Sequence, residues 1–160
     1  MLLCERPLQV IEDIGDLRGL SNKILLILNM KLSEINNLTK EIIGAAIEVH
    51  RTLGPGLLEE AYEAALAYEL NQRGFKTNTQ VHIPIIYKNI ELDKGYRADI
   101  IVNDEVILEL KATEKEKDIF YKQLLTYLRL SNKRIGLLIN FNKEKLTDGV
   151  RRVINGEIPI

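Results

Sequence analysis

The chain has 160 residues, 46% of them hydrophobic and 28% charged, which predicts one ordinary globular domain with a core rather than two domains. Its formal net charge of −1 does not by itself indicate a nucleic-acid-binding protein. Residues 111–152 nevertheless hold 11 Lys or Arg against 5 Asp or Glu, whereas residues 1–110 hold 11 against 17. This basic last third points only weakly to a polyanionic partner, because a solvated helix face explains most such runs.

The single cysteine, Cys4, excludes an intrachain disulfide and a zinc site built on thiolates, and it suggests a reducing compartment. The longest apolar run, residues 24–28, is far shorter than the ~20 residues of a membrane span. We therefore expect a cytoplasmic protein with no membrane partner, and the sequence does not indicate its oligomeric state.

Residues 1–36 show no clean helical or strand period, so we expect an N-terminal extension that is poorly ordered and lies outside the domain. Met30 begins a segment that would make a natural start of translation. The extension can therefore also be read as untranslated sequence upstream of Met30, and the sequence leaves Met1 and Met30 both open as the start. The domain itself is expected to occupy residues 37–160.

Two helices are predicted at the start of this domain. The first begins at Thr39, with Asn37 or Thr39 as its N-cap, and ends at the "LGPG" of residues 53–56. The second runs from about Leu57 to Arg73 and ends at Gly74, because glycine is favoured directly after a helix.

The pattern then changes to the period of two that is typical of strands. Strands are predicted at residues 80–87, 96–102 and 106–112, a third helix at 117–130, and a last strand at 134–141. The order α-α-β-β-β-α-β indicates an α/β (α+β) fold with a central, mixed four-stranded sheet flanked by helices.

The hairpin of residues 96–112 has two possible registers. A two-residue turn at Asn103-Asp104 would mix polar and apolar side chains on both faces, whereas a three-residue loop, 103–105, places Asp99 opposite Glu109. The second register groups eight residues on one apolar face: Tyr96, Ala98, Ile100, Val102, Val106, Leu108, Leu110 and Ala112. It places six on the other: Arg97, Asp99, Ile101, Ile107, Glu109 and Lys111. We therefore predict the three-residue loop.

Two carboxylates opposite each other on adjacent strands repel, which should raise one pKa unless a cation lies between them. A divalent metal would remove the repulsion, and carboxylate oxygens suit Mg²⁺ or Mn²⁺ better than zinc. Lys111, two residues beyond Glu109, would stand beside such a metal. There its ammonium could orient or deprotonate a water molecule and stabilise negative charge. The alternative is a solvated face with ordinary ion pairs.

Asp99 followed by Glu109-Leu110-Lys111 resembles the PD-(D/E)xK nuclease superfamily. The segment "GLLEEAY", residues 56–62, further resembles the signature of the GxxExxY proteins, and the likeness covers residues 38–155. The resemblance implies a restriction-endonuclease-like core with Asp99, Glu109, the Leu110 carbonyl and Glu59 as metal ligands, and Lys111, Glu109 and Asp99 as catalytic residues. Glu59 could instead merely favour the start of its helix.

Substrate contacts are also implied by the resemblance. Gln123 and Tyr127, one turn apart on the third helix, resemble a Gln-Tyr motif that lies near the active site and touches substrate phosphate. Where relatives often have a histidine three residues before this glutamine, the chain has Phe120. Tyr62 is a further candidate for substrate binding, although a role as a core aromatic is favoured for it. His50 either has a structural role, which is favoured, or points at the site.

The sequence thus predicts a metal-dependent nuclease that hydrolyses phosphodiester bonds in nucleic acid, with DNA favoured over RNA and Mg²⁺ or Mn²⁺ as cofactor. The alternative is a non-catalytic module of the same fold that binds nucleic acid or a protein partner. A hydrolase of small phosphorylated molecules is a third possibility and would need a closed pocket.

Overall fold

The computed structural model describes residues 17–156 and divides the chain into two units, residues 1–36 and 37–160. The first helix, α1, spans Leu17–Leu53, so the expected helix start at Asn37 or Thr39 is wrong and residues 17–36 are helical. These residues include strong helix formers, but their apolar side chains are consecutive and do not form one stripe, so a test for periodicity misses them. Within residues 17–156, no helix combines the length and apolar content needed to cross a membrane.

Helix α2, Glu59–Gln72, ends in a Schellman motif. The Phe75 N–H donates to the Leu70 carbonyl at 3.0 Å and the Gly74 N–H to the Asn71 carbonyl at 3.0 Å, while Gly74 adopts a φ of +87°. The predicted end of this helix at Gly74 is confirmed. Helix α3, Asp118–Leu130, also agrees with its prediction to within one residue.

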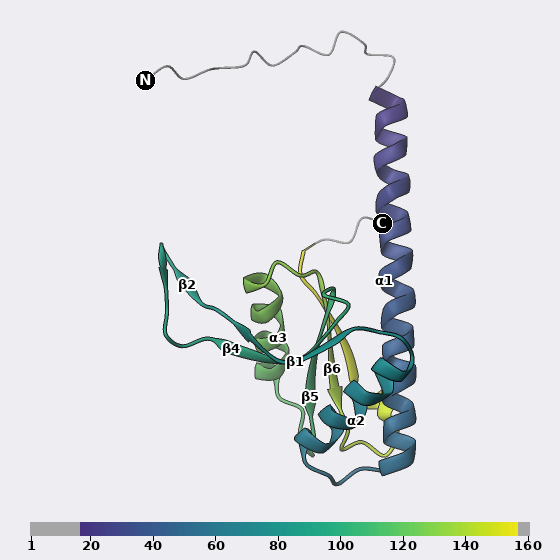
Figure 1. The fold of residues 1–160 in the computed structure, drawn as a ribbon, viewed down its shortest axis with the longest axis vertical. Coiled ribbons are helices and arrows are strands. Elements are labelled where there is room, and N and C mark those ends of the chain that lie inside the picture. The colour runs from purple at the N-terminus through teal and green to yellow at the C-terminus, as the bar shows by residue number, and fades with distance from the viewer. Residues whose placement is uncertain (1–16, 157–160) are drawn as a thin grey trace. The chain divides into compact units, whose positions relative to one another are not determined.

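The central sheet has five strands in the order β1-β4-β5-β6-β7, one more than predicted. Their bounds are Thr77–Ile83 for β1, Tyr96–Val102 for β4, Val106–Lys111 for β5, Ile135–Asn140 for β6 and Val150–Ile154 for β7. Only β5 and β6 pair in parallel, and the 3-10 turn η1, Leu146–Gly149, leads into β7. The short strands β2, Ile86–Tyr87, and β3, Ile90–Glu91, form a separate hairpin that extends away from the sheet (Figure 1).

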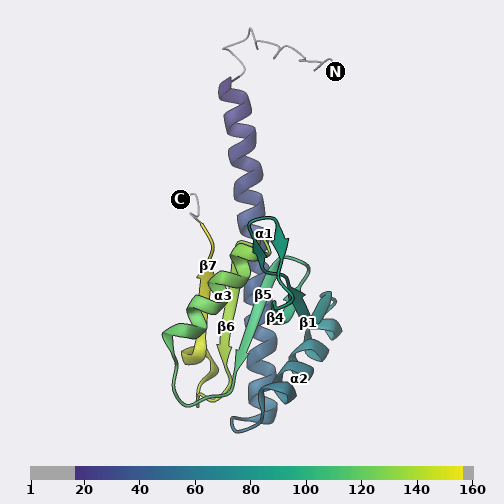
Figure 2. The ribbon, with the colours of Figure 1, turned by 90° about the vertical axis from the view of Figure 1, so that its left-hand side faces the viewer.

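Helices cover both faces of this sheet. Helix α3, which connects β5 to β6, lies on one face, while α2 and residues 37–53 of α1 lie on the other (Figures 1 and 2). Every residue of β6 is buried, as expected for a central strand covered on both sides. This mixed sheet between helices agrees with the α+β class predicted from the sequence.

The side chains of β4 do not all lie on the predicted faces of the sheet. The core cluster beneath α3 includes Ala98 as well as Ile101 and Ile107, and Tyr96 packs against it with its ring 5.0 Å from that of Tyr127. Residues with even and odd numbers in one strand cannot share a face while the period of two holds. The strand β4 therefore switches faces around Asp99, and the expectation that Tyr96 and Ala98 lie on the same face as Ile100 is wrong.

Candidate metal and catalytic site

The turn between β4 and β5 has the predicted register. Asn103 and Asp104 both adopt positive φ, +50° and +57°, and the Glu105 N–H donates to the Val102 carbonyl at 2.9 Å. Glu105 is then an additional residue before the first pair, Val102 with Val106, so the loop takes three residues. This register, confirmed by the pairing of Ile100 with Leu108, aligns Asp99 with Glu109.

Asp99 interrupts the ladder between these strands. Regular pairing ends at Ile100 and Leu108, and the Leu110 N–H donates to Oδ2 of Asp99 at 2.7 Å instead of to a backbone carbonyl. The Leu110 carbonyl points to the same side of β5 as its N–H, because the two backbone groups of a strand residue share a direction. The ligand candidates Asp99 and Leu110 therefore meet where the two strands separate.

Glu59, Asp99 and Glu109 form the acidic group of the site. Glu109 is the most deeply buried of them, with a relative exposure of 5%. Its Oε1 accepts a hydrogen bond from Nζ of Lys111 at 2.8 Å, whereas its Oε2 is buried and has no hydrogen-bond partner among the described residues. Burial and the nearby charge of Asp99 raise the pKa of Glu109 from 4.5 to about 7, against the opposing effect of Lys111. A buried carboxylate oxygen without a partner is costly, and a cation would satisfy it.

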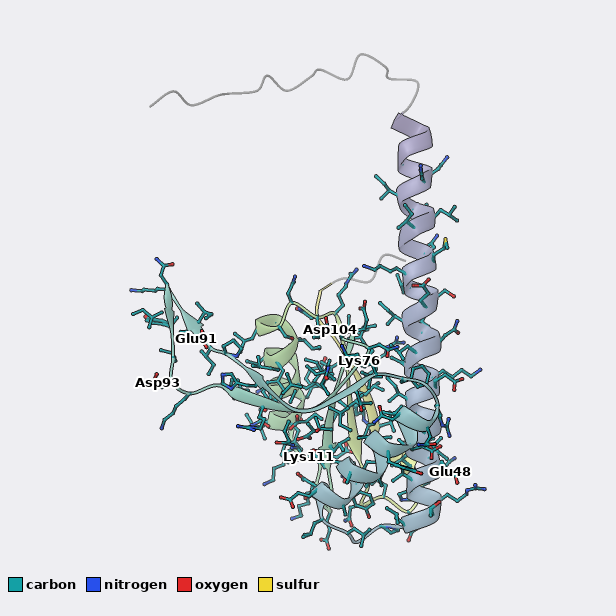
Figure 3. The ribbon with its side chains drawn as sticks, viewed as in Figure 1. Glu48, Lys76, Glu91, Asp93, Asp104 and Lys111 are labelled. Atoms are coloured by element: carbon teal, nitrogen blue, oxygen red, sulfur yellow. The ribbon has the colours of Figure 1, made fainter. Side chains whose placement is uncertain are left out.

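The pKa of Asp99 is also raised, chiefly by burial, although the Leu110 N–H and the Lys111 charge oppose the rise. Lys111 lies at the end of β5 opposite the Asp104 turn (Figure 3). Burial alone would lower the pKa of Lys111, but its hydrogen bond with Glu109 and the charges of Glu109, Glu59 and Asp99 raise it overall. Lys111 is therefore a cation held by the acidic group.

Phe120 of α3 completes the surroundings of Lys111. The Lys111 Nζ lies 5.0 Å from the centre of the Phe120 ring, a cation–π distance. The aromatic ring of Phe120 thus contacts the candidate catalytic lysine directly.

Glu59, at the start of α2, reaches the end of β5. Its Oε1 accepts a hydrogen bond from the Ala112 N–H at 3.3 Å, and its charge acts on Asp99, Glu109 and Lys111. Across residues 17–156, however, no group of three or more Asp, Glu, His or Cys side chains is arranged to hold a metal ion. The donors fit Mg²⁺ or Mn²⁺ better as two carboxylates plus water and substrate oxygens, a common arrangement for Mg²⁺.

The two candidates on α3 differ in environment. Tyr127 is 6% exposed within the core cluster, and burial together with the charges of Glu109 and Asp99 raises its pKa to about 12. Its hydroxyl therefore stays protonated and can act only as a neutral hydrogen-bonding group. Gln123 is half-buried, and its side chain makes no hydrogen bond with any described residue, which leaves the amide available for a substrate oxygen.

Tyr62 is a core residue. It is fully buried, its ring stacks on Phe141 at 4.3 Å, its hydroxyl donates to the Gly54 carbonyl at 2.6 Å, and the same oxygen accepts from the Leu57 N–H at 3.1 Å. These contacts occupy the hydroxyl in shaping the loop before α2. Tyr62 therefore has the core role that the sequence favoured for it, and its buried side chain offers no surface for a substrate contact.

His50 also has a structural role, because its ring forms a hydrogen bond within the fold. Its Nε2 lies 2.7 Å from the Lys143 carbonyl, which can only accept, so the ring donates this hydrogen bond. The contact ties α1 to the loop after β6.

An open cleft lies beside the acidic group. Its volume is about 580 Å³, and Ala112, the residue after Lys111, lines both this cleft and a smaller hollow that includes Glu59. Lys115 and Lys117 form part of the cleft wall together with the acidic Glu114, and Leu57 and Leu58 lie on the side of α2. A chain bound near Glu109 could therefore continue into a space that offers both cationic and apolar contacts.

Three residues near the site gave no signal in the sequence. Gln80 of β1 donates from its amide to Oε2 of Glu63 on α2 at 2.6 Å, and its side chain helps to lower the pKa of Asp99 against the larger effect of burial. Asn140, 2% exposed at the end of β6, bonds both the N–H and the carbonyl of Thr113, at 3.2 and 2.8 Å, and so fixes the segment that follows Lys111. A single Gln, Glu or Asn outside a motif does not indicate such contacts.

A mixed sheet between helices, with an acidic pair and a lysine where its central hairpin opens, defines a restriction-endonuclease-like class of protein. Residues 36–153 match the family model described as the PD-(D/E)XK nuclease superfamily. The chain belongs to this superfamily.

One curated relative is similar in sequence, but its name describes a CoA hydrolase and not a nuclease. It is the 1,4-dihydroxy-2-naphthoyl-CoA hydrolase of Trichodesmium erythraeum (strain IMS101), which is 30% identical over 107 residues, covering 60% of the chain and 75% of the relative. No solved structure shows a significant match to the chain.

Proposed function

We propose that the protein is a metal-dependent nuclease that hydrolyses phosphodiester bonds in nucleic acid, with DNA as the expected polymer. The observation that carries the proposal is the buried, unpartnered Oε2 of Glu109, next to Asp99 and within reach of Lys111. Such an oxygen disfavours folding, so its retention is best explained by a cation that binds there in the working enzyme.

Asp99, Glu109 and the Leu110 carbonyl would hold Mg²⁺ or Mn²⁺, and Glu59 would add negative charge from α2. The bound ion would polarise the scissile phosphate and lower the pKa of an attacking water molecule. Lys111, placed beside the acidic pair by its hydrogen bond to Glu109, would direct its ammonium at the attacking water or at the phosphate oxygens. Phe120 limits the orientations of that ammonium through its ring face.

The surroundings also supply contacts for a polymer. The amide of Gln123 can donate to a phosphate oxygen, and Lys115 and Lys117 in the adjoining cleft can bind a phosphate further along the strand. These lysines belong to the basic last third of the chain, residues 111–152, so part of its excess positive charge would serve to bind phosphate.

The test compares Lys111→Ala with the matched variant Lys133→Ala. Lys133 has a similarly buried side chain, 14% exposed against 15% for Lys111, and it also pairs with a carboxylate, Asp104, at 2.9 Å, but at the far end of the hairpin. Single- and double-stranded DNA and RNA are incubated with Mg²⁺ or Mn²⁺. We expect Lys111→Ala to lose at least a hundredfold in cleavage rate and Lys133→Ala to retain the rate. Equal rates for wild type and Lys111→Ala would refute the proposal.

A non-catalytic module of the same fold predicts binding without cleavage. Nucleic-acid binding by the wild type that is insensitive to Mn²⁺ and to Asp99→Ala would favour this alternative over the enzyme. Calorimetric titration with Mn²⁺ separates the two directly, because the nuclease requires a metal site that Asp99→Ala abolishes.

A second catalytic candidate is hydrolysis of a CoA thioester, and the observation in its favour is the name of the relative from Trichodesmium erythraeum. Glu109, with a pKa of about 7, could act as a general base at neutral pH. An assay that follows thiol release from aromatic acyl-CoA substrates tests this candidate. Thiol release that depends on Glu109 and does not need a divalent metal would replace the nuclease proposal.

A further inference from the structure

The strand β1 departs from regular geometry at Gln80. Its neighbours Thr79 and Val81 pair with Ile100 and Ala98 of β4, which places Gln80 opposite Asp99, but those two residues are not paired. Gln80 also adopts a φ of +52°, in the left-handed region. A residue with a side chain pays an energetic penalty there, and such conformations in the middle of a strand concentrate at functional sites.

The side chain of Gln80 binds one carboxylate, Glu63, and lies beside a second, Asp99. Its amide nitrogen donates to Oε2 of Glu63 at 2.6 Å, and its position in β1 lies opposite Asp99, whose pKa burial raises and the polar Gln80 side chain helps to lower. A glutamine amide has two N–H donors and no charge, so it can bridge two carboxylates, whereas a lysine there would neutralise them. Glu63 lies one helical turn after Glu59 on α2, so its hydrogen bond with Gln80 links that helix to the sheet at the point where the sheet opens.

Asp99 needs support from side chains because regular sheet pairing does not hold it on either side. On the β5 side its Oδ2 accepts from the Leu110 N–H at 2.7 Å, and on the β1 side its neighbour is the unpaired Gln80. We propose that Gln80 is a positioning residue that fixes the Asp99 carboxylate for metal binding, and that Glu63 fixes Gln80. This inference deepens the proposed nuclease function and rests on it for the identity of the bound group.

The left-handed φ provides a variant that separates positioning from folding. Gln80→Gly removes the amide but suits the backbone, because glycine adopts positive φ without a steric penalty. A residue with a purely structural role would be replaced by glycine without loss. The matched control is Asn132→Gly, since Asn132 has nearly the same φ, +53°, in the loop after α3.

The first measurement needs no metal and no substrate. The Leu110 N–H is held by Asp99, so its hydrogen-exchange rate in the metal-free protein, followed by NMR, reports how firmly that carboxylate is placed. We expect Gln80→Gly to speed exchange at Leu110 about tenfold, with no decrease in melting temperature and no change at Leu108. Unchanged exchange at Leu110 would overturn the inference, whatever the protein catalyses.

The second measurement addresses the metal. We expect Gln80→Gly to raise the dissociation constant for Mn²⁺ about tenfold and to lower kcat while KM for DNA is retained, and we expect Asn132→Gly to change neither. Glu63→Gln, which keeps an acceptor for the Gln80 amide, should stay within twofold of wild type, whereas Glu63→Ala should behave like Gln80→Gly.

The two proposals fail in different ways. If Leu110 exchange responds to Gln80→Gly but the wild type neither binds Mn²⁺ nor cleaves nucleic acid, the positioning role stands and the nuclease function fails. If the wild type binds Mn²⁺ and cleaves, and Gln80→Gly matches it in affinity and kcat, the positioning role fails alone.

Discussion

Glu109→Gln should make the metal-free protein more stable at neutral and alkaline pH. The pKa of Glu109 rises from 4.5 in the unfolded chain to about 7 in the fold, where burial and Asp99 disfavour its charge. At about 1.4 kcal/mol for each pKa unit, the charged Glu109 lowers the free energy of unfolding by about 3 kcal/mol. Glutamine resembles the protonated acid, and its amide oxygen can still accept the hydrogen bond from Lys111.

The sign follows from proton binding. Between pH 4.5 and about 7 the folded protein keeps a proton on Glu109 that the unfolded chain has released, so wild-type stability falls as pH rises through this range. This contribution is fully present below pH 4.5 and is lost above about pH 7. Glu109→Gln has no such group, so its advantage over the wild type should grow by about 3 kcal/mol from pH 4.5 to pH 8.

The assay is urea denaturation with EDTA at several pH values between 4.5 and 8. Glu105→Gln, at an exposed position in the turn of the same hairpin, is the control and should keep the wild-type decline because Glu109 is intact. If the free energy of unfolding had the same pH dependence for wild type and Glu109→Gln, the reasoning would be refuted. At pH 8, Mg²⁺ at 100 times its dissociation constant should then stabilise the wild type by about 2.7 kcal/mol and leave Glu109→Gln unchanged.

Three further substitutions test the supports of the site. Phe120→Leu removes the ring beneath the Lys111 ammonium, so kcat should fall several-fold while the melting temperature changes little. Asn140→Ala removes both hydrogen bonds to Thr113, and chemical unfolding should show a loss of about 2–3 kcal/mol. Gly136→Ala places a Cβ about 2.8 Å from the buried Leu124 side chain, which must shift within the core, so the protein should lose about 1–3 kcal/mol in the same assay.

The register of the central hairpin was predictable because apolar and charged residues alternate in the second half of β5, residues 108–111. Val106, Leu108 and Leu110 alternate with Ile107, Glu109 and Lys111, and only a three-residue loop aligns the two acids. The same alternation brings Lys111 to Glu109, since residues two apart share a face. Sequence reasoning therefore reached the acidic pair and its lysine without any knowledge of the helices.

The surroundings of Asp99 were not predictable in this way. A period of two assumes regular pairing, whereas β4 changes faces at Asp99 and Gln80 has a positive φ that no residue type there would suggest. A weak signal existed: residues 100–102 of β4 are three consecutive apolar residues, all buried, which is more than one face can use. The strand β7 was missed for a related reason, because the adjacent Arg151 and Arg152 break the expected alternation in a short segment.

Several local departures from regular structure meet around Asp99. Neither adjacent strand pairs with this residue, its neighbour Gln80 occupies left-handed backbone space, and Glu109 Oε2 is the buried side-chain atom left without a partner in residues 17–156. Each departure disfavours folding, and random imperfections would be scattered over the sheet. Their concentration at one point indicates selection for something other than stability, as expected where a fold keeps a functional site. The opening of the strands gives the Asp99 carboxylate and the Leu110 carbonyl a common space that a regular ladder would have closed.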